Sequence, residues 1–184
     1  MKTIIINGSP RKSGNTSSLI SCLVPLLDSE VQVISPYSLD ISPCTDCRHC
    51  HTFPECIIKD DMTALYAPLL SADNIIIASP LYFSELTSGV LTLASRFQFF
   101  YTSRFVRGDL KSIKPKKAAV ILVGGGSSKT DEKALSTASI ILSSLNAKVI
   151  ASLSYINTDI LPASEDSSVL LRLKEIAYKL SGCK

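Results

Sequence analysis

The chain has 184 residues, of which 46% are hydrophobic and 19% are charged, and its net charge is +3. This length and composition predict a globular domain with a full-sized core and exclude a disordered chain. The small charge and the scattered basic residues argue against a nucleic-acid partner. No apolar stretch has the length of a membrane span, and the N-terminus lacks the pattern of a signal peptide. We therefore expect a cytoplasmic protein without a membrane partner.

The first sixteen residues have the order strand, polar loop, helix. Residues 3–6 are apolar and β-branched, which is typical of a buried strand, and helical apolar spacing begins at Leu19. The loop between them lies at the N-terminus of the helix, where unpaired backbone N–H groups and the helix dipole favour an anion. We therefore predict a pocket for one phosphate group. The polar side chains that the loop offers are Ser9, Arg11, Lys12, Ser13, Thr16 and Ser17.

Spacing excludes two other kinds of phosphate loop. Five residues separate Gly8 from Gly14, and Asn15 stands where a nucleoside-triphosphate loop has its lysine. The close glycine pair of a dinucleotide loop is missing as well. The remaining alternative is an ordinary strand–helix turn that is rich in small polar residues.

Strand and helix patterns alternate along the rest of the chain. We expect strands at 3–6, 31–35, 74–79, 118–123 and 149–156. We expect helices at 16–28, 60–70, 85–101, 130–145 and 165–181, the last ending at Gly182. Pro25 and Pro68 should kink or break their helices. This rhythm predicts an α/β, flavodoxin-like three-layer sandwich with a five-stranded parallel sheet in the order 2-1-3-4-5. One domain should span 1–184, with a cysteine-rich loop insertion at about 43–58.

In such a sheet, a ligand binds beyond the carboxyl ends of the strands, at the point where the strand order reverses. Strand three ends in an aromatic segment with Tyr82 and Phe83, and strand four ends in the glycine run 124–126, followed by two serines. Glycine backbone can approach a flat ring closely. A phosphate pocket beside a flat slot predicts a phosphorylated aromatic cofactor. Alternatively, the two aromatic residues belong to the core and the glycine run is a plain loop.

Three segments resemble the NADPH-dependent FMN reductase and iron–sulfur flavoprotein group of the flavodoxin-like superfamily. They are GSPRKSGNT at 8–16, SPLYFSELTSG at 79–89 and PCTDCRHCHTFPECIIKDDM at 43–62. The resemblance covers residues 1 to about 155. It departs from the family at Thr92 and Ser95-Arg96, because the family has a lysine and then an Asp-Arg pair there, and only the arginine is kept.

The resemblance implies FMN as cofactor. The phosphate would be held by Ser9, Arg11, Ser13, Asn15, Thr16 and Ser17. The isoalloxazine ring would lie against Pro80, Leu81, Tyr82 and Phe83, with Gly124 and Gly125 nearby.

Four cysteines form a compact C-x2-C-x2-C-x5-C motif: Cys44, Cys47, Cys50 and Cys56. In a cytoplasmic protein, such cysteines are expected to be ligands, redox groups or core residues rather than disulfides. Their spacing resembles that of a [4Fe–4S] site. Zinc is an alternative, with His49 and His51 within the loop, and a motif without metal is another. We expect Cys22 to lie in the core and Cys183 to have no role.

Five aromatic residues crowd around the end of the third helix: Phe97, Phe99, Phe100, Tyr101 and Phe105. No single helix face could bury them all, so an exposed apolar patch is expected. Such a patch indicates a homodimer interface or, alternatively, a substrate lid.

These observations predict an FMN-dependent NAD(P)H oxidoreductase of the flavin or quinone reductase type, with NADPH or NADH as co-substrate. The acceptor would be a small molecule or a protein. The alternative is an iron–sulfur flavoprotein that exchanges electrons with ferredoxin and makes no direct use of nicotinamide. Since the flavin carries the redox chemistry, we predict no catalytic acid, base or nucleophile from the chain.

Overall fold

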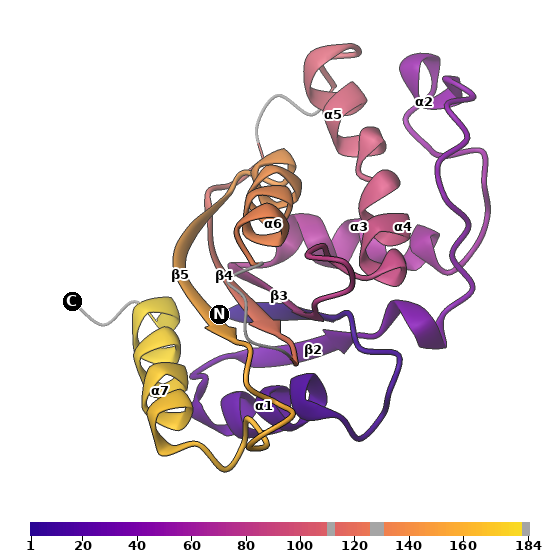
Figure 1. Ribbon diagram of the computed structural model, residues 1–184. Helices are drawn as coiled ribbons and strands as arrows, with labels where there is room; N and C mark the ends of the chain where they lie inside the picture. Colours follow the sequence, from indigo (N-terminus) through magenta and orange to yellow (C-terminus); the bar gives the residue numbers. More distant parts are fainter. Residues whose placement is uncertain (110–112, 126–130, 182–184) are drawn as a thin grey trace.

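A computed structural model describes residues 1–109, 113–125 and 131–181. A five-stranded parallel sheet lies between two helical layers, with the strand order β2-β1-β3-β4-β5 (Figure 1). This confirms the predicted flavodoxin-like class and the order 2-1-3-4-5. The strands are β1 (Lys2–Asn7), β2 (Glu30–Ile34), β3 (Asn74–Pro80), β4 (Lys116–Val123) and β5 (Ala147–Tyr155).

Seven α-helices are found within the described ranges of the chain. They are α1 (Asn15–Leu23), α2 (His49–Thr52), α3 (Met62–Ser71), α4 (Ser88–Ser95), α5 (Gln98–Phe105), α6 (Glu132–Ser144) and α7 (Ser167–Ser181). Two short 3-10 helices, η1 (Val24–Leu26) and η2 (Pro36–Ser38), flank β2. The expected helix start at Thr130, the cap at Gly182 and Cys183 lie outside the described residues. None of the described helices combines the length and apolar character that crossing a bilayer requires.

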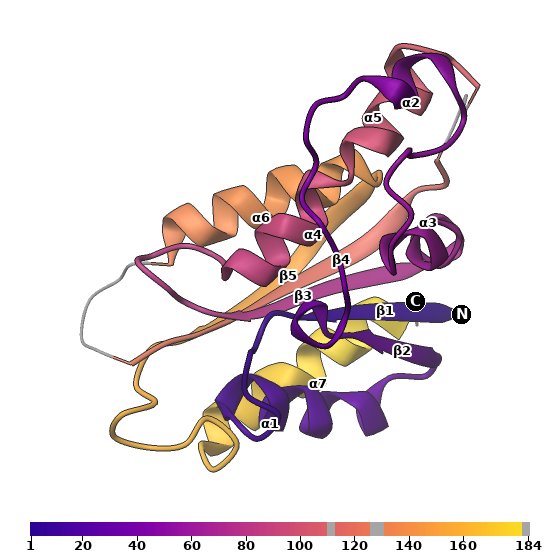
Figure 2. The same cartoon turned by 90° about the vertical axis from the view of Figure 1, so that its right-hand side faces the viewer.

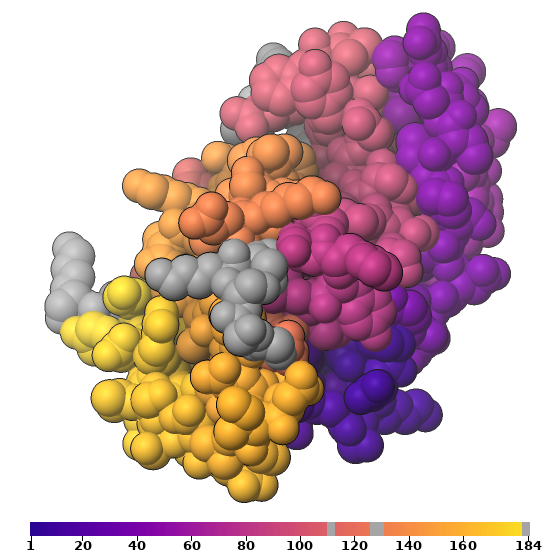
Figure 3. Space-filling view, in the orientation of Figure 1, coloured from indigo at the N-terminus to yellow at the C-terminus, as the bar shows by residue number. Residues whose placement is uncertain are grey.

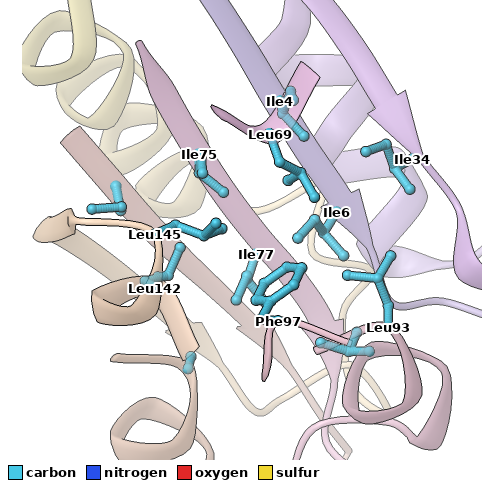
Figure 4. Packing of buried hydrophobic residues seen from close by; sticks show 14 of the residues in the cluster. Ile4, Ile6, Ile34, Leu69, Ile75, Ile77, Leu93, Phe97, Leu142 and Leu145 are labelled. Carbon is cyan, nitrogen blue, oxygen red and sulfur yellow. The ribbon is translucent and has the colours of Figure 1, made fainter. Parts of the chain in front are cut away.

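Alternation along the strands divides the core into two layers. Ile4 and Ile6 point to the face that is covered by α3, α4 and α6; Leu69 and Leu93 lie near them, and Leu142 lies farther along the same face, next to Leu145 (Figure 4). The intervening strand residue points to the opposite face, which α1 and α7 cover. The predicted inward face of α7 is buried as expected: Val169, Leu173, Ile176, Ala177 and Leu180.

The two prolines affect their helices differently. The first helix ends at Leu23, and Pro25 lies in the 3-10 turn that follows, so the predicted break is confirmed there. In contrast, α3 continues through Pro68 to Ser71. A proline in the last turn removes one backbone hydrogen bond, and the packing of α3 against the sheet tolerates this loss.

The expected single helix at 85–101 is wrong, because two helices occupy this region. Between α4 and α5 the chain passes through Arg96 and Phe97, which are both buried. The predicted aromatic patch splits as a result: Phe100 is also buried, whereas Tyr101 and Phe105 are 52% and 63% exposed. The break between α4 and α5 changes the direction of the chain. Phe97 and Phe100 can therefore both be buried, which one continuous helix would not allow for all five rings.

Candidate functional site

The loops that follow β1, β3, β4 and β5 meet at the carboxyl edge of the sheet, where the strand order reverses between β1 and β3. Their segments lie next to one another on the face seen in Figure 3. They enclose a cleft of about 220 Å³. Its lining consists of Ser9, Pro10, Arg11, Gly14, Asn15, Thr16, Pro80, Leu81, Tyr82, Val123, Gly124, Gly125, Thr158 and Asp159.

Nine of the twelve residues predicted to contact the cofactor line this cleft. They are Ser9, Arg11, Asn15, Thr16, Pro80, Leu81, Tyr82, Gly124 and Gly125. The other three, Ser13, Ser17 and Phe83, are not among the lining residues. The structure thus brings the two predicted segments together, while their role as cofactor contacts stays a prediction.

The N-terminus of α1 opens into the cleft without a capping side chain. Gly14 precedes the helix and no acidic residue stands in the first turn. The first-turn N–H groups and the helix dipole therefore favour an anion at this place. Asn15 also connects the loop to the region before α7, because its Oδ1 accepts a hydrogen bond of 2.8 Å from the backbone N–H of Ala163.

The loop after β1 is held by its own side chains. The hydroxyls of Ser9 and Ser17 both donate to the carbonyl of Arg11, each over 3.0 Å. Asn7 supports both serines, since its Oδ1 accepts from the backbone N–H of Ser9 and its Nδ2 donates to the Ser17 hydroxyl. Sequence reasoning missed Asn7, although an Asn at a strand end is a known signal for such a turn.

Gly8 fixes this loop to the rest of the sheet. Its N–H donates to the carbonyl of Ala78 over 2.7 Å, and its carbonyl accepts from the Thr87 hydroxyl over 2.8 Å. A Cβ at Gly8 would lie 2.6 Å from Cγ2 of Val90, closer than real Cβ contacts come. Only glycine fits here, between the loop after β1 and α4.

The second half of the cleft is the slot beside the ends of β3 and β4, lined by Pro80, Leu81, Tyr82, Gly124 and Gly125. Leu81 continues the pairing of the two strands, because its N–H donates to the carbonyl of Val123 over 2.8 Å. A Cβ on Gly125 would overlap the carboxylate of Asp159, which follows β5. Sequence reasoning missed Thr158 and Asp159, although the end of the fifth strand must lie at the same edge. The residues after Gly125 in the predicted glycine run, 126–128, lie outside the described residues.

Phe83 occupies a tight turn at the rim of the cleft. Tyr82 and Glu85 exchange two backbone hydrogen bonds of 3.0 Å, with Phe83 and Ser84 between them at φ of 54° and 63°. Positive φ at both central residues defines the turn that joins tightly paired strands, and it is costly for a residue as bulky as phenylalanine. The Phe83 side chain is fully exposed.

The four cysteines of the motif line one small cavity of about 40 Å³, beside α5. The backbone N–H of Cys44 donates to the Ser95 hydroxyl, and Arg107 donates to the carbonyl of Cys50. His51 also lines the cavity. In residues 1–109, 113–125 and 131–181, no group of three or more His, Cys, Asp or Glu residues is arranged to hold a metal ion. The four cysteines therefore line one cavity, but their side chains are not arranged as a metal site.

The family described as NADPH-dependent FMN reductase matches residues 1–159. The chain belongs to this family.

Two relatives of this FMN reductase family member are both iron–sulfur flavoproteins. That of Archaeoglobus fulgidus is 32% identical over 137 residues, which cover 73% of this chain and 59% of the relative. That of Methanosarcina thermophila is 28% identical over 138 residues, covering 73% and 69%. The chain thus spans about three fifths of the length of the first relative.

A solved flavone reductase superposes on 98% of this chain and 62% of its own, with a TM-score of 0.70 and 21% sequence identity. At this identity the likeness shows the flavodoxin-like fold alone.

In this family member, a buried ion pair anchors the cysteine segment. Nη1 of Arg96 lies 2.6 Å from Oδ2 of Asp60, with side chains 1% and 6% exposed. The same guanidinium donates to the carbonyls of Ser42 and Ile58. Burial would raise the pKa of Asp60, but the hydrogen bonds from Arg96 and from the backbone N–H of Ser42 hold it below its ordinary value.

The cavity region contains donors without acceptors. Nη2 of Arg96 donates to Sγ of Cys56 over 3.3 Å, while Nε of Arg96 has no partner among the described residues. The buried hydroxyl of Tyr66 is also without one. Burial raises the pKa of Tyr66, so its phenol keeps its proton. Four thiols and spare N–H and O–H donors are the chemistry that an anionic, sulfur-ligated group requires, so the donor set fits an iron–sulfur cluster.

The backbone between the first three cysteines is strained. Asp46 and Arg48 have φ of 51° and 59°, in the left-handed region that side chains other than glycine seldom adopt. Each such residue persists only where its surroundings hold it there. Here the strain lies within the cysteine motif itself.

Proposed function

We propose that the chain is an FMN-dependent NAD(P)H oxidoreductase of the flavin or quinone reductase type. The observation that carries this proposal is the cleft at the β1/β3 reversal, which joins an uncapped helix N-terminus to a slot lined by glycine and Tyr82. Membership of the FMN reductase family supports the same function.

The phosphate of FMN would be bound by first-turn N–H groups of α1, with Arg11 supplying charge. Ser9 and Ser17 already donate to the loop backbone, so their hydroxyls would have to rotate to reach a phosphate. Pro80, Leu81 and Tyr82 would flank the ring. When bound, FMN accepts two electrons from a nicotinamide and passes them on in pairs or singly. The chain itself binds, orients and shields the reacting ring.

The test is anaerobic mixing of the FMN-loaded protein with NADPH and, separately, with NADH. The proposal predicts rapid loss of the flavin absorbance with at least one of the two. Unchanged flavin absorbance with both nucleotides, together with reduction by a reduced ferredoxin, would contradict it and favour the carrier function below.

A second candidate function is an iron–sulfur flavoprotein that exchanges electrons with ferredoxin, with a [4Fe–4S] cluster on Cys44, Cys47, Cys50 and Cys56. The specific observation in its favour is that all four cysteines line one cavity with spare hydrogen-bond donors. Iron, sulfide and zinc analysis of anaerobically purified protein tests it. Equal amounts of iron and sulfide are expected, whereas zinc alone or no metal would contradict it.

We also propose that the protein is a cytoplasmic homodimer that associates through α5. Tyr101, Phe105 and Val106 leave an apolar surface there. Sedimentation should give a dimer for the wild type and a monomer for Phe105→Glu. A monomeric wild type would contradict the proposal.

A further inference from the structure

Two arginines of the α4–α5 region reach the cysteine segment from the protein interior. Arg96 is 2% exposed, and the side chain of Arg107 is 9% exposed. Arg96 donates to Sγ of Cys56, and Arg107 donates to the backbone of Cys50. Of these two residues, only Arg96 contacts a cysteine sulfur.

The charges of both arginines are already balanced. Asp60 pairs with Arg96, and Asp109 pairs with Arg107 at 2.7 Å. A net positive potential is therefore not what these residues add to the cavity. What they add is hydrogen-bond donors, since a guanidinium carries five N–H groups and accepts none.

Two donors in this region have no acceptor among the described residues. They are Nε of Arg96, which belongs to a residue that lines the cavity, and the hydroxyl of Tyr66, which lies beside Arg96 and Cys56. Tyr66 is packed against Phe99 and Phe100, with ring centroids 4.5 and 5.5 Å apart, so its position is fixed. Buried donors are seldom left unpaired unless a partner binds later.

We propose that Arg96 and Tyr66 are positioning residues for an iron–sulfur cluster on the four cysteines, and that their spare donors hydrogen-bond to its sulfur atoms. Arg96 also holds the Cys56 side chain in place. Hydrogen bonds to cluster sulfurs favour the reduced, more negative state, so both residues raise the reduction potential. This inference rests on the [4Fe–4S] cluster of the second candidate function.

A purely structural role is the simple alternative, because Arg96 also ties the segment to α4 through Asp60, Ser42 and Ile58. Such a role would not change the reduction potential of a loaded cluster. Tyr66→Phe distinguishes a structural role from hydrogen bonding to the cluster, since it removes one hydroxyl without a partner and leaves the ring packing in place.

The experiment uses the full chain, reconstituted anaerobically with ferrous iron and sulfide. Tyr66→Phe and Arg96→Gln are compared with the wild type and with Arg172→Gln. Arg172 is a matched control, because it also donates to a backbone carbonyl, that of Ser152, but lies on the exposed face of α7. Iron and sulfide per chain and the midpoint potential, followed by electron paramagnetic resonance, are measured.

We expect the wild type and Arg172→Gln to take up the same amounts of iron and sulfide and to have the same midpoint potential. Tyr66→Phe should take up as much iron and sulfide as the wild type. Its equilibrium constant for one-electron reduction should be lower by up to about tenfold, which lowers the midpoint potential by up to about 59 mV. Arg96→Gln should lose at least half of the iron.

Iron content and midpoint potentials equal to those of the wild type in both variants would overturn the inference but would not argue against the cluster itself. A wild type that takes up no iron and sulfide, or only zinc, would overturn the cluster and the inference together. If Arg96→Gln does not fold, the midpoint potential of Tyr66→Phe tests the inference alone: a lower value supports it, and a value equal to that of the wild type overturns it.

Discussion

The cleft and the cysteine cavity lie at opposite ends of α4 and are built in different ways. The hydroxyl of Thr87, just before α4, donates to the carbonyl of Gly8 in the loop after β1, while the hydroxyl of Ser95, the last residue of α4, accepts from the backbone N–H of Cys44. Thr87 and Ser95 are eight positions apart in the sequence, which corresponds to about 12 Å along a helix. The side chains of Ser9 and Ser17 pair with the backbone of the loop after β1, and the first-turn N–H groups of α1 are left open toward the cleft. At the cysteine cavity, in contrast, two side-chain donors, Nε of Arg96 and the Tyr66 hydroxyl, have no partner among the described residues.

Their supports differ as well. The cleft is formed by loops that are hydrogen-bonded directly to the central strands, whereas α2 and α5 extend beyond one end of the sheet (Figure 2). Residues 40–48 before α2 have no regular secondary structure. The cysteine segment, residues 42–60, is therefore held to the fold by side-chain contacts such as the Arg96–Asp60 pair.

Replacing Asp60 by Ala should have the largest effect, because it leaves the buried Arg96 charge without its partner. We expect the free energy of unfolding to fall by about 3–5 kcal/mol in urea denaturation. Lys59→Ala is the control, since its pair with Glu55 is exposed and screened by solvent, so its loss should change the free energy of unfolding little. Equal small losses in both variants would show that the pair does not anchor the segment.

Gly8→Ala should damage the cleft directly. The new Cβ would force Val90 or the loop to move, at a cost of about 1–3 kcal/mol in unfolding free energy. We also expect FMN binding to weaken by about tenfold or more, since each factor of ten corresponds to about 1.4 kcal/mol.

The control is Ser21→Ala on the exposed side of α1, whose hydroxyl donates to the carbonyl of Ser17 and does not line the cleft. Its FMN affinity, measured by fluorescence titration, should stay close to that of the wild type. If Gly8→Ala binds FMN as well as Ser21→Ala does, the close packing of the loop against α4 is not needed for binding.

Acid should weaken the cysteine segment through Asp60. Its pKa is lower in the folded protein than the value of about 3.9 in an unfolded chain. The contribution of the pair is therefore complete above about pH 4 and is lost as the pH falls through the folded pKa. Denaturation between pH 6 and pH 2 should show a steeper loss for the wild type than for Asp60→Asn/Arg96→Gln. Parallel curves would contradict this role of Asp60.

Tyr66→Phe should have the smallest effect on the metal-free protein. The hydroxyl it removes is buried without a partner, so the free energy of unfolding should stay the same or rise by up to about 1 kcal/mol. A loss of more than about 1 kcal/mol in urea denaturation would show that the hydroxyl has a partner within the chain itself.

The sheet and much of the cleft could be predicted from the sequence because their signals are local. Apolar runs mark the strands, and the polar loop before Asn15 marks the helix start. The break between α4 and α5 could not be predicted in this way. Arg96, which follows the last residue of α4, is buried in a pair with Asp60, and this partner lies 36 residues earlier in the sequence. Asp159 was missed for a similar reason, since its place beside Gly125 is set by the sheet and not by its neighbours in sequence.

The most direct test of the account is whether the purified chain binds FMN in the cleft. Titration of FMN with the protein, followed by flavin fluorescence and by the flavin retained after gel filtration, measures this. We predict one FMN per chain in the wild type, with a clearly weaker affinity in Gly8→Ala. A protein that is colourless as purified and retains no added FMN would contradict it.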